Sequence, residues 1–105
     1  MTSVVTANVT TSVGLAYAST GNTAVTWLSI CNYSAGAAAA NVYIVPNGQT
    51  ADNTNQILAN LALEVGDTYQ AYAAAEKIVL ADGDSIQISA NVNNALTTVV
   101  TYTGI

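Results

Sequence analysis

Apolar and polar side chains alternate along much of this chain, and the alternation predicts β-strands. It is clearest over residues 84–92, where aliphatic or alanine side chains alternate with serine, glutamine and asparagine. Residues 96–102 repeat the pattern, although Val99 adds an apolar position to the polar face. A period of two is that of an extended strand, whose successive side chains point to opposite faces. We therefore expect an all-β chain.

Residues 23–33 form the most apolar of the predicted strands. Leu28 and Ile30 fall on one face; the opposite face carries Val25, Trp27, Cys31 and Tyr33. A solvent-facing Trp and Tyr would leave large rings uncovered, so we expect another surface to pack on them. The single cysteine cannot form an internal disulfide, and we expect it to be buried and unreactive.

Two segments fit either a strand or a helix. The four alanines of residues 37–40 favour a helix in isolation, but Gly36 and the β-branched residues within 41–45 favour a strand. In residues 57–63, Leu58 and Leu61 have helical spacing, whereas every second residue from Ile57 suits a strand. We predict a strand for both segments.

A repeated turn follows two of these strands. Residues 63–69 and 80–86 both read Leu-x-x-Gly-Asp, followed by Ser or Thr and a large apolar residue. The glycine can adopt the positive φ of a tight turn, and the aspartate can accept hydrogen bonds from nearby backbone N–H groups. With these turns the predicted strands are 12–18, 23–33, 37–45, 57–63, 67–73, 76–80, 84–92 and 96–102.

About eight short strands with short connections indicate an antiparallel β-sandwich, either a jelly roll or an immunoglobulin-like Greek key. The length of 105 residues predicts one domain, 1–105. Residues 1–10 are left open as a strand or an extended arm.

The composition excludes most enzyme chemistry. The chain has no histidine and only one basic residue, Lys77, so it lacks the base of a nucleophilic triad and the ligands of a zinc site. The closest carboxylate pair, Asp82 and Asp84, lies in a turn where capping the backbone is its expected role. We predict no catalytic, cofactor-binding or metal-binding residues and no enzyme activity.

The net charge of −5 also limits the partners. Nucleic acids and anionic membranes attract proteins through lysine and arginine, so neither is expected to bind. The first residues have no basic segment followed by an apolar run, and we expect a protein that is made and folded in a cytoplasm.

The aromatic residues are the remaining functional candidates, because their rings bury well while their polar tips stay hydrated. With so few charges on the chain, we expect at least one face to bury against a partner. The candidate interface residues are Trp27, Tyr33, Tyr43, Tyr69, Tyr72 and Tyr102.

Several segments resemble small virion structural proteins of tailed bacteriophages. The resemblance covers residues 23–105 and is carried by Trp-Leu-Ser-Ile-Cys-Asn at 27–32, Val-Tyr-Ile-Val-Pro-Asn-Gly at 42–48, the two Gly-Asp turns and the Thr/Val-rich end. It implies a β-sandwich that decorates the head surface as a cement protein. The implied partners are the major capsid protein and neighbouring copies of the chain, as a trimer. The alternative is a tail, baseplate or fibre module that binds host-surface glycan or a neighbouring virion protein.

Overall fold

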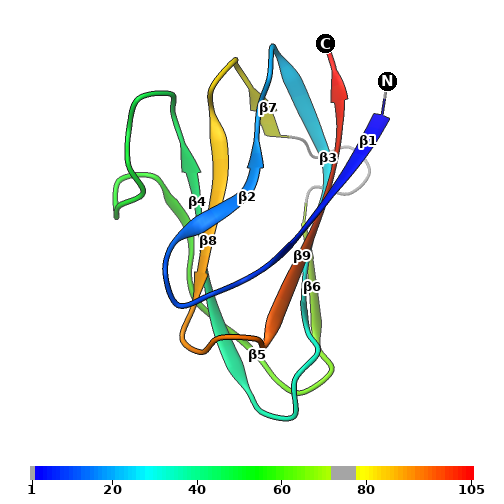
Figure 1. Ribbon diagram of the computed structural model, residues 1–105, viewed down its shortest axis with the longest axis vertical. Helices are drawn as coiled ribbons and strands as arrows, with labels where there is room; N and C mark the ends of the chain where they lie inside the picture. The colour runs from blue at the N-terminus through cyan, green and yellow to red at the C-terminus, as the bar shows by residue number, and fades with distance from the viewer. Residues whose placement is uncertain (1, 72–77) are drawn as a thin grey trace.

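The computed structural model describes residues 2–71 and 78–105, and these residues form nine β-strands and no helix (Figure 1). The strands are β1 (Thr2–Asn8), β2 (Gly14–Ala18), β3 (Thr23–Asn32), β4 (Ala38–Val45), β5 (Gln56–Leu63), β6 (Thr68–Ala71), β7 (Ile78–Leu80), β8 (Ser85–Ala90) and β9 (Leu96–Gly104). Each predicted strand is confirmed, except that residues 72–73 and 76–77 of two predictions lie outside the described residues. The open question at the N-terminal end is answered by β1, which is a strand.

The strands form two antiparallel sheets, as expected for a β-sandwich. Sheet A has the order β1-β9-β3-β6, with β7 also paired to β3, and sheet B has the order β2-β8-β4-β5. In the view of Figure 1, sheet B lies on the left and sheet A on the right, and β1 and β2 run along the front. The predicted all-β sandwich is therefore confirmed.

The pairing pattern is that of a jelly roll. From the outside inwards, β1 pairs with β9, β2 with β8, β3 with both β6 and β7, and β4 with β5. The chain is thus one long hairpin, with its tip at the loop of residues 46–55, that has rolled so that successive pairs alternate between the sheets. In the immunoglobulin arrangement several consecutive strands pair within one sheet, whereas here β4 and β5 are the one consecutive pair among the described strands.

The core lies between the sheets and consists of aliphatic side chains and one stacked tyrosine pair. Its fully buried members include Val25, Leu28 and Ile30 of β3. Tyr17 and Tyr102 stack with ring centroids 4.3 Å apart, and the Tyr17 hydroxyl donates to Thr23 Oγ1 at 3.3 Å. Stacked rings and a satisfied hydroxyl allow a tyrosine to be buried at little cost.

A bulge in β3 corrects the predicted faces of that strand. The register with β9 shifts between Val25 and Trp27, so one extra residue reverses the alternation. Val25 is consequently fully buried together with Leu28 and Ile30, and does not share the face of Trp27 and Cys31 as the alternation predicted.

Bulges in β5 explain its ambiguous sequence pattern. The register with β4 shifts twice, and Asn60 has a φ of 53°. The extra residue lets Leu58 and Leu61 both pack towards the core although three positions separate them. The helical spacing in this segment therefore comes from a bulged strand, and Ile57 is exposed.

The two Gly-Asp turns have the predicted geometry. Gly66 and Gly83 have φ values of 81° and 85°. Asp67 Oδ2 accepts a hydrogen bond from the Glu64 backbone N–H at 3.1 Å, and Asp84 Oδ2 accepts one from Ala81 at 3.0 Å. Beyond the second turn β8 ends at Ala90, two residues before its predicted end, and Val92 lies in the following loop with 40% of its surface exposed.

Candidate interaction surfaces

The outer face of sheet A is broad and uncharged. The alternation in each strand sends one set of side chains into the core and the other set to this face. We call it the Trp27 face; its members are Val4, Thr6 and Asn8 of β1, Thr97, Val99, Thr101 and Thr103 of β9, Trp27, Ser29 and Cys31 of β3, and Thr68 and Gln70 of β6. Aliphatic, aromatic and hydroxyl groups thus cover four adjacent strands.

Carboxylates in the described residues are confined to turns. Asp52 lies in the β4–β5 loop, Glu64 and Asp67 in the β5–β6 turn, and Asp82 and Asp84 in the β7–β8 turn. In Figure 1 the β5–β6 turn is at the lower end of the sandwich and the β7–β8 turn at the upper end. Both sheet faces are therefore free of formal charge within the described ranges.

The outer face of sheet B is more polar. We call it the Tyr43 face; it carries Leu15 of β2, Gln87 of β8, Asn41 and Tyr43 of β4, and Gln56 of β5. Ser85 and Ser89 of β8 are turned to the same side of the sheet but are buried. Asn41 Oδ1 accepts hydrogen bonds from Gln56 Nε2 at 3.1 Å and from the Asn60 backbone N–H at 2.9 Å. The amides next to Tyr43 are therefore held in place by the β5 bulge.

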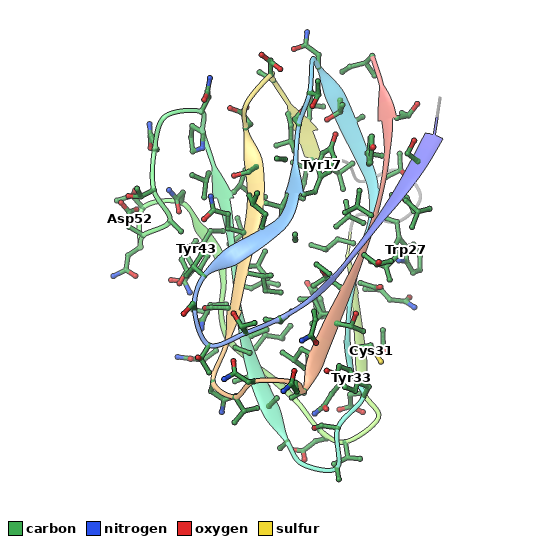
Figure 2. The ribbon with its side chains drawn as sticks, in the orientation of Figure 1. Tyr17, Trp27, Cys31, Tyr33, Tyr43 and Asp52 are labelled. Atoms are coloured by element: carbon green, nitrogen blue, oxygen red, sulfur yellow. The ribbon has the colours of Figure 1, made fainter. Side chains whose placement is uncertain are left out.

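The six aromatic candidates do not form one patch. Trp27 and Tyr43 are half-buried on opposite outer faces of the sandwich, as Figure 2 shows. Tyr69 and Tyr102 pack against the core from its edge. Tyr33 is 53% exposed at the end of β3, and Tyr72 lies outside the described residues. Of the five candidates that the structure describes, Trp27 and Tyr43 alone are therefore on a broad sheet surface.

Tyr33 takes part in a polar cluster near one end of the sandwich. Its hydroxyl donates to Asn8 Oδ1 at 2.8 Å, and Asn8 Nδ2 donates to Asn94 Oδ1 at 3.2 Å. These bonds connect the end of β1 to the loop before β9. They give Tyr33 a structural role, while its ring remains accessible.

Cys31 differs from its prediction. The thiol is half-buried on the Trp27 face rather than in the core, because Leu28 and Ile30 take the inward positions of β3. It forms no disulfide.

The carboxylates act as backbone caps. Asp82 Oδ1 accepts from the Gly21 N–H at 2.8 Å, and Asp84 Oδ1 accepts from the Asn47 N–H at 2.9 Å, which confirms the capping role predicted for this pair. In the exposed β4–β5 loop, hydrogen bonds from the Thr54 side chain and then from its backbone lower the pKa of Asp52 below 3.8. Within residues 2–71 and 78–105, no three metal-ligating side chains gather at one place.

Sequence reasoning missed the contribution of β1 and β9 to the Trp27 face. Val4 is 62% exposed opposite Thr101, and Val99 is half-buried opposite Thr6 on the same face. The signals were present as the run of β-branched residues at 4–6 and the apolar Val99 on a polar face. Finding the face also required the pairing of β1 with β9, which joins the two ends of the described chain.

The described chain contains no helix that is long and apolar enough to span a membrane. Comparison of the chain with protein-family models, with curated proteins and with solved structures found no match.

Proposed function

We propose that this chain is a structural protein that works by packing against other protein subunits. The observation that carries the proposal is the Trp27 face, where four strands present uncharged side chains around a half-buried tryptophan. Interface cores are depleted of charged residues and enriched in aromatic ones. Burying an uncharged surface of this kind against another protein has a small desolvation cost, because no carboxylate has to be buried with it.

A bacteriophage head is the setting we propose for this packing. The resemblance of residues 23–105 to small virion proteins of tailed phages supports it, with the chain as a decoration protein that bridges subunits of the major capsid protein on the head surface. Jelly rolls occur both in viral capsids and in lectins, so the fold alone does not choose between assembly and sugar binding. The uncharged faces favour assembly.

Two matched lysine variants test which face makes the contact. Val99→Lys and Gln87→Lys each place one positive charge on the second strand of a sheet, β9 in sheet A and β8 in sheet B. Each protein is mixed with undecorated heads and sedimented. We expect the wild-type chain and Gln87→Lys to sediment at a fixed ratio to capsid subunits and Val99→Lys to stay in the supernatant.

Wild-type protein that remains in the supernatant would overturn the decoration role. Loss of binding in Gln87→Lys alone would instead move the contact to the Tyr43 face. Both variants must keep the wild-type denaturation midpoint, so that loss of binding is not loss of folding.

Glycan binding by a tail or fibre module is the second candidate, and the Tyr43 face favours it. A tyrosine ring beside the amides of Asn41, Gln56 and Gln87 offers a flat apolar surface with donors and acceptors at its rim. A glycan array probed with wild-type protein and with Tyr43→Ala tests this function. Binding that Tyr43→Ala removes would support it, and a blank array would count against it.

A further inference from the structure

The edge strands of the two sheets differ in how they are protected. An open edge presents unpaired N–H and C=O groups, and proteins commonly protect such edges with bulges, short strands, prolines or charges. Here β5 has two register shifts and the left-handed Asn60, β2 has five residues and one shift, and the described parts of β6 and β7 have four and three residues. Within residues 2–71 and 78–105, three of the four sheet edges are therefore irregular or short.

The fourth edge, β1, has none of these protections. Its seven residues pair with β9 without a register shift, and they include no proline and no charged side chain. Within the described ranges its other side pairs with no strand. Figure 1 shows β1 along the front of the molecule, drawn across β9 and β3. This edge is thus regular enough to accept another strand.

The hydrogen bonds to β9 tell which residues of β1 face outwards. The Val9 N–H donates to Leu96 O at 2.9 Å, which makes Val9 and Leu96 a hydrogen-bonded pair in the same register as β1 and β9. Such pairs alternate along an antiparallel ladder, so the odd-numbered residues of β1 bond to β9. The backbone groups of Thr2, Val4, Thr6 and Asn8 therefore point to the open edge.

We propose that β1 pairs antiparallel with β1 of a second copy of this chain, so that two A sheets join into one continuous sheet. A register centred on Val5 sets Val4 opposite Thr6 of the second copy and Thr2 opposite Asn8. It is the one two-fold register that pairs every outward-facing residue of the strand. It also sets Val4, whose side chain is 62% exposed, beside the second copy, and brings the two Val5 residues together on the axis.

The partner is a second copy of the chain, because the open edge of β1 can form hydrogen bonds with the same edge of another copy. A two-fold contact uses one surface twice and closes, whereas rings and filaments need two different surfaces on each subunit. The other edges are short or bulged, so they are poor partners for β1. The proposal thus names a dimer, in place of the trimer implied by the phage resemblance, and it builds on the assembly function proposed above.

The register gives a sharp cysteine test. In a Cys31→Ser background, Val5→Cys places two thiols on the axis at a non-hydrogen-bonded pair, where Cα atoms lie about 4.5 Å apart and a disulfide can close. Ser3→Cys is the matched control, because it also faces inwards on β1 but lies about 13 Å along the strand from its own copy. Oxidised Val5→Cys should give a disulfide-linked dimer on a non-reducing gel, and Ser3→Cys should not. Equal cross-linking of both variants, or of neither, would overturn the proposal.

Sedimentation of the unmodified chain is the second, independent measurement. We expect a mass about twice the 10.7 kDa of one chain. Thr6→Pro removes an outward-facing N–H while leaving the bonds to β9, and should weaken the dimer at least tenfold; Thr6→Val keeps the N–H and should stay dimeric. A wild-type monomer or trimer would refute the two-fold edge. A monomer that still sediments with phage heads would leave the decoration function standing, which separates the two failures.

Discussion

The repeated Gly-Asp turn offers a matched pair of alanine substitutions at Gly66 and Gly83. Both glycines have nearly the same φ, 81° and 85°, which disfavours an L-residue by about 1–2 kcal/mol. Replacing glycine also restricts the unfolded chain, which offsets about 0.4–1 kcal/mol of that cost. Around Gly66 a new Cβ meets no atom within 4 Å. We therefore expect Gly66→Ala to lower the free energy of unfolding by about 1 kcal/mol.

Gly83→Ala should cost more because the new methyl group meets Asn47. A Cβ at Gly83 would lie 2.5 Å from Asn47 Cγ. The Asn47 backbone cannot retreat freely, since its N–H donates to Asp84 Oδ1 at 2.9 Å. Its exposed side chain must therefore turn away from its preferred rotamer, at about 0.5–1.5 kcal/mol. The total for Gly83→Ala is about 2 kcal/mol.

Urea denaturation measures both costs. With an m-value of about 2 kcal/mol/M, the extra 1 kcal/mol at Gly83 moves the midpoint roughly 0.5 M further than Gly66→Ala does. In an Asn47→Ala background the clash is gone, and Gly83→Ala should then cost as much as Gly66→Ala. Equal midpoints for the two single variants, or an excess that persists without the Asn47 side chain, would refute the steric explanation.

Three further substitutions test the core, a buried polar residue and a loop. Leu28→Ala should lower the free energy of unfolding by about 2–5 kcal/mol through the cavity it leaves, whereas exposed Leu15→Ala should change it by less than about 0.5 kcal/mol; urea denaturation compares them. Asn32 is fully buried and its Nδ2 donates to Gly36 O at 2.9 Å and Leu63 O at 3.0 Å, so Asn32→Asp sets a carboxylate against two carbonyls. The introduced carboxyl has a raised pKa in the folded state, and stability should recover as the pH falls through it; a variant equally stable at pH 4 and pH 8 would contradict this. Thr54→Val removes the side-chain hydrogen bond that lowers the pKa of Asp52 most and should raise that pKa towards 3.8, as an NMR titration would show. Because the wild-type pKa is depressed, the stability that Asp52 contributes is lost as the pH falls below 3.8.

The strands could be predicted from sequence because each depends on a local pattern. The alternation at 84–92 shows which face of the strand is buried, and the glycines of the Gly-Asp turns indicate a positive φ. The bulges at Thr26 and Asn60 could not be predicted, because a bulge exists only relative to the partner strand. The buried position of Val25 follows from such a bulge, so local alternation placed it on the wrong face.

The candidate surface was predicted less completely than the fold. The outward position of Trp27 followed from the alternation in its own strand. Tyr69 and Tyr102 instead face the core, and the local sequence around a tyrosine does not show whether its side chain lies on the core side or the outer side of its strand. The strand order decides which side chains become neighbours, and that order comes from pairing between distant segments. Val4 and Val99 could not be placed beside Trp27 until β1, β9 and β3 were known to be adjacent.

The rolled hairpin also sets the order in which the chain can fold during synthesis. Among the strands that the structure describes, β4 and β5 alone are neighbours in sequence that pair directly, so they can close early, whereas β1 must wait for β9. Contacts between distant segments carry a large loop-closure entropy and make folding slow. While the ribosome is still adding β9, the regular edge of β1 is unpaired on both sides, and nascent chains on neighbouring ribosomes are most prone to aggregate through it. Selective ribosome profiling should therefore show chaperone contact that begins once β1 has left the ribosome and persists through the synthesis of β9.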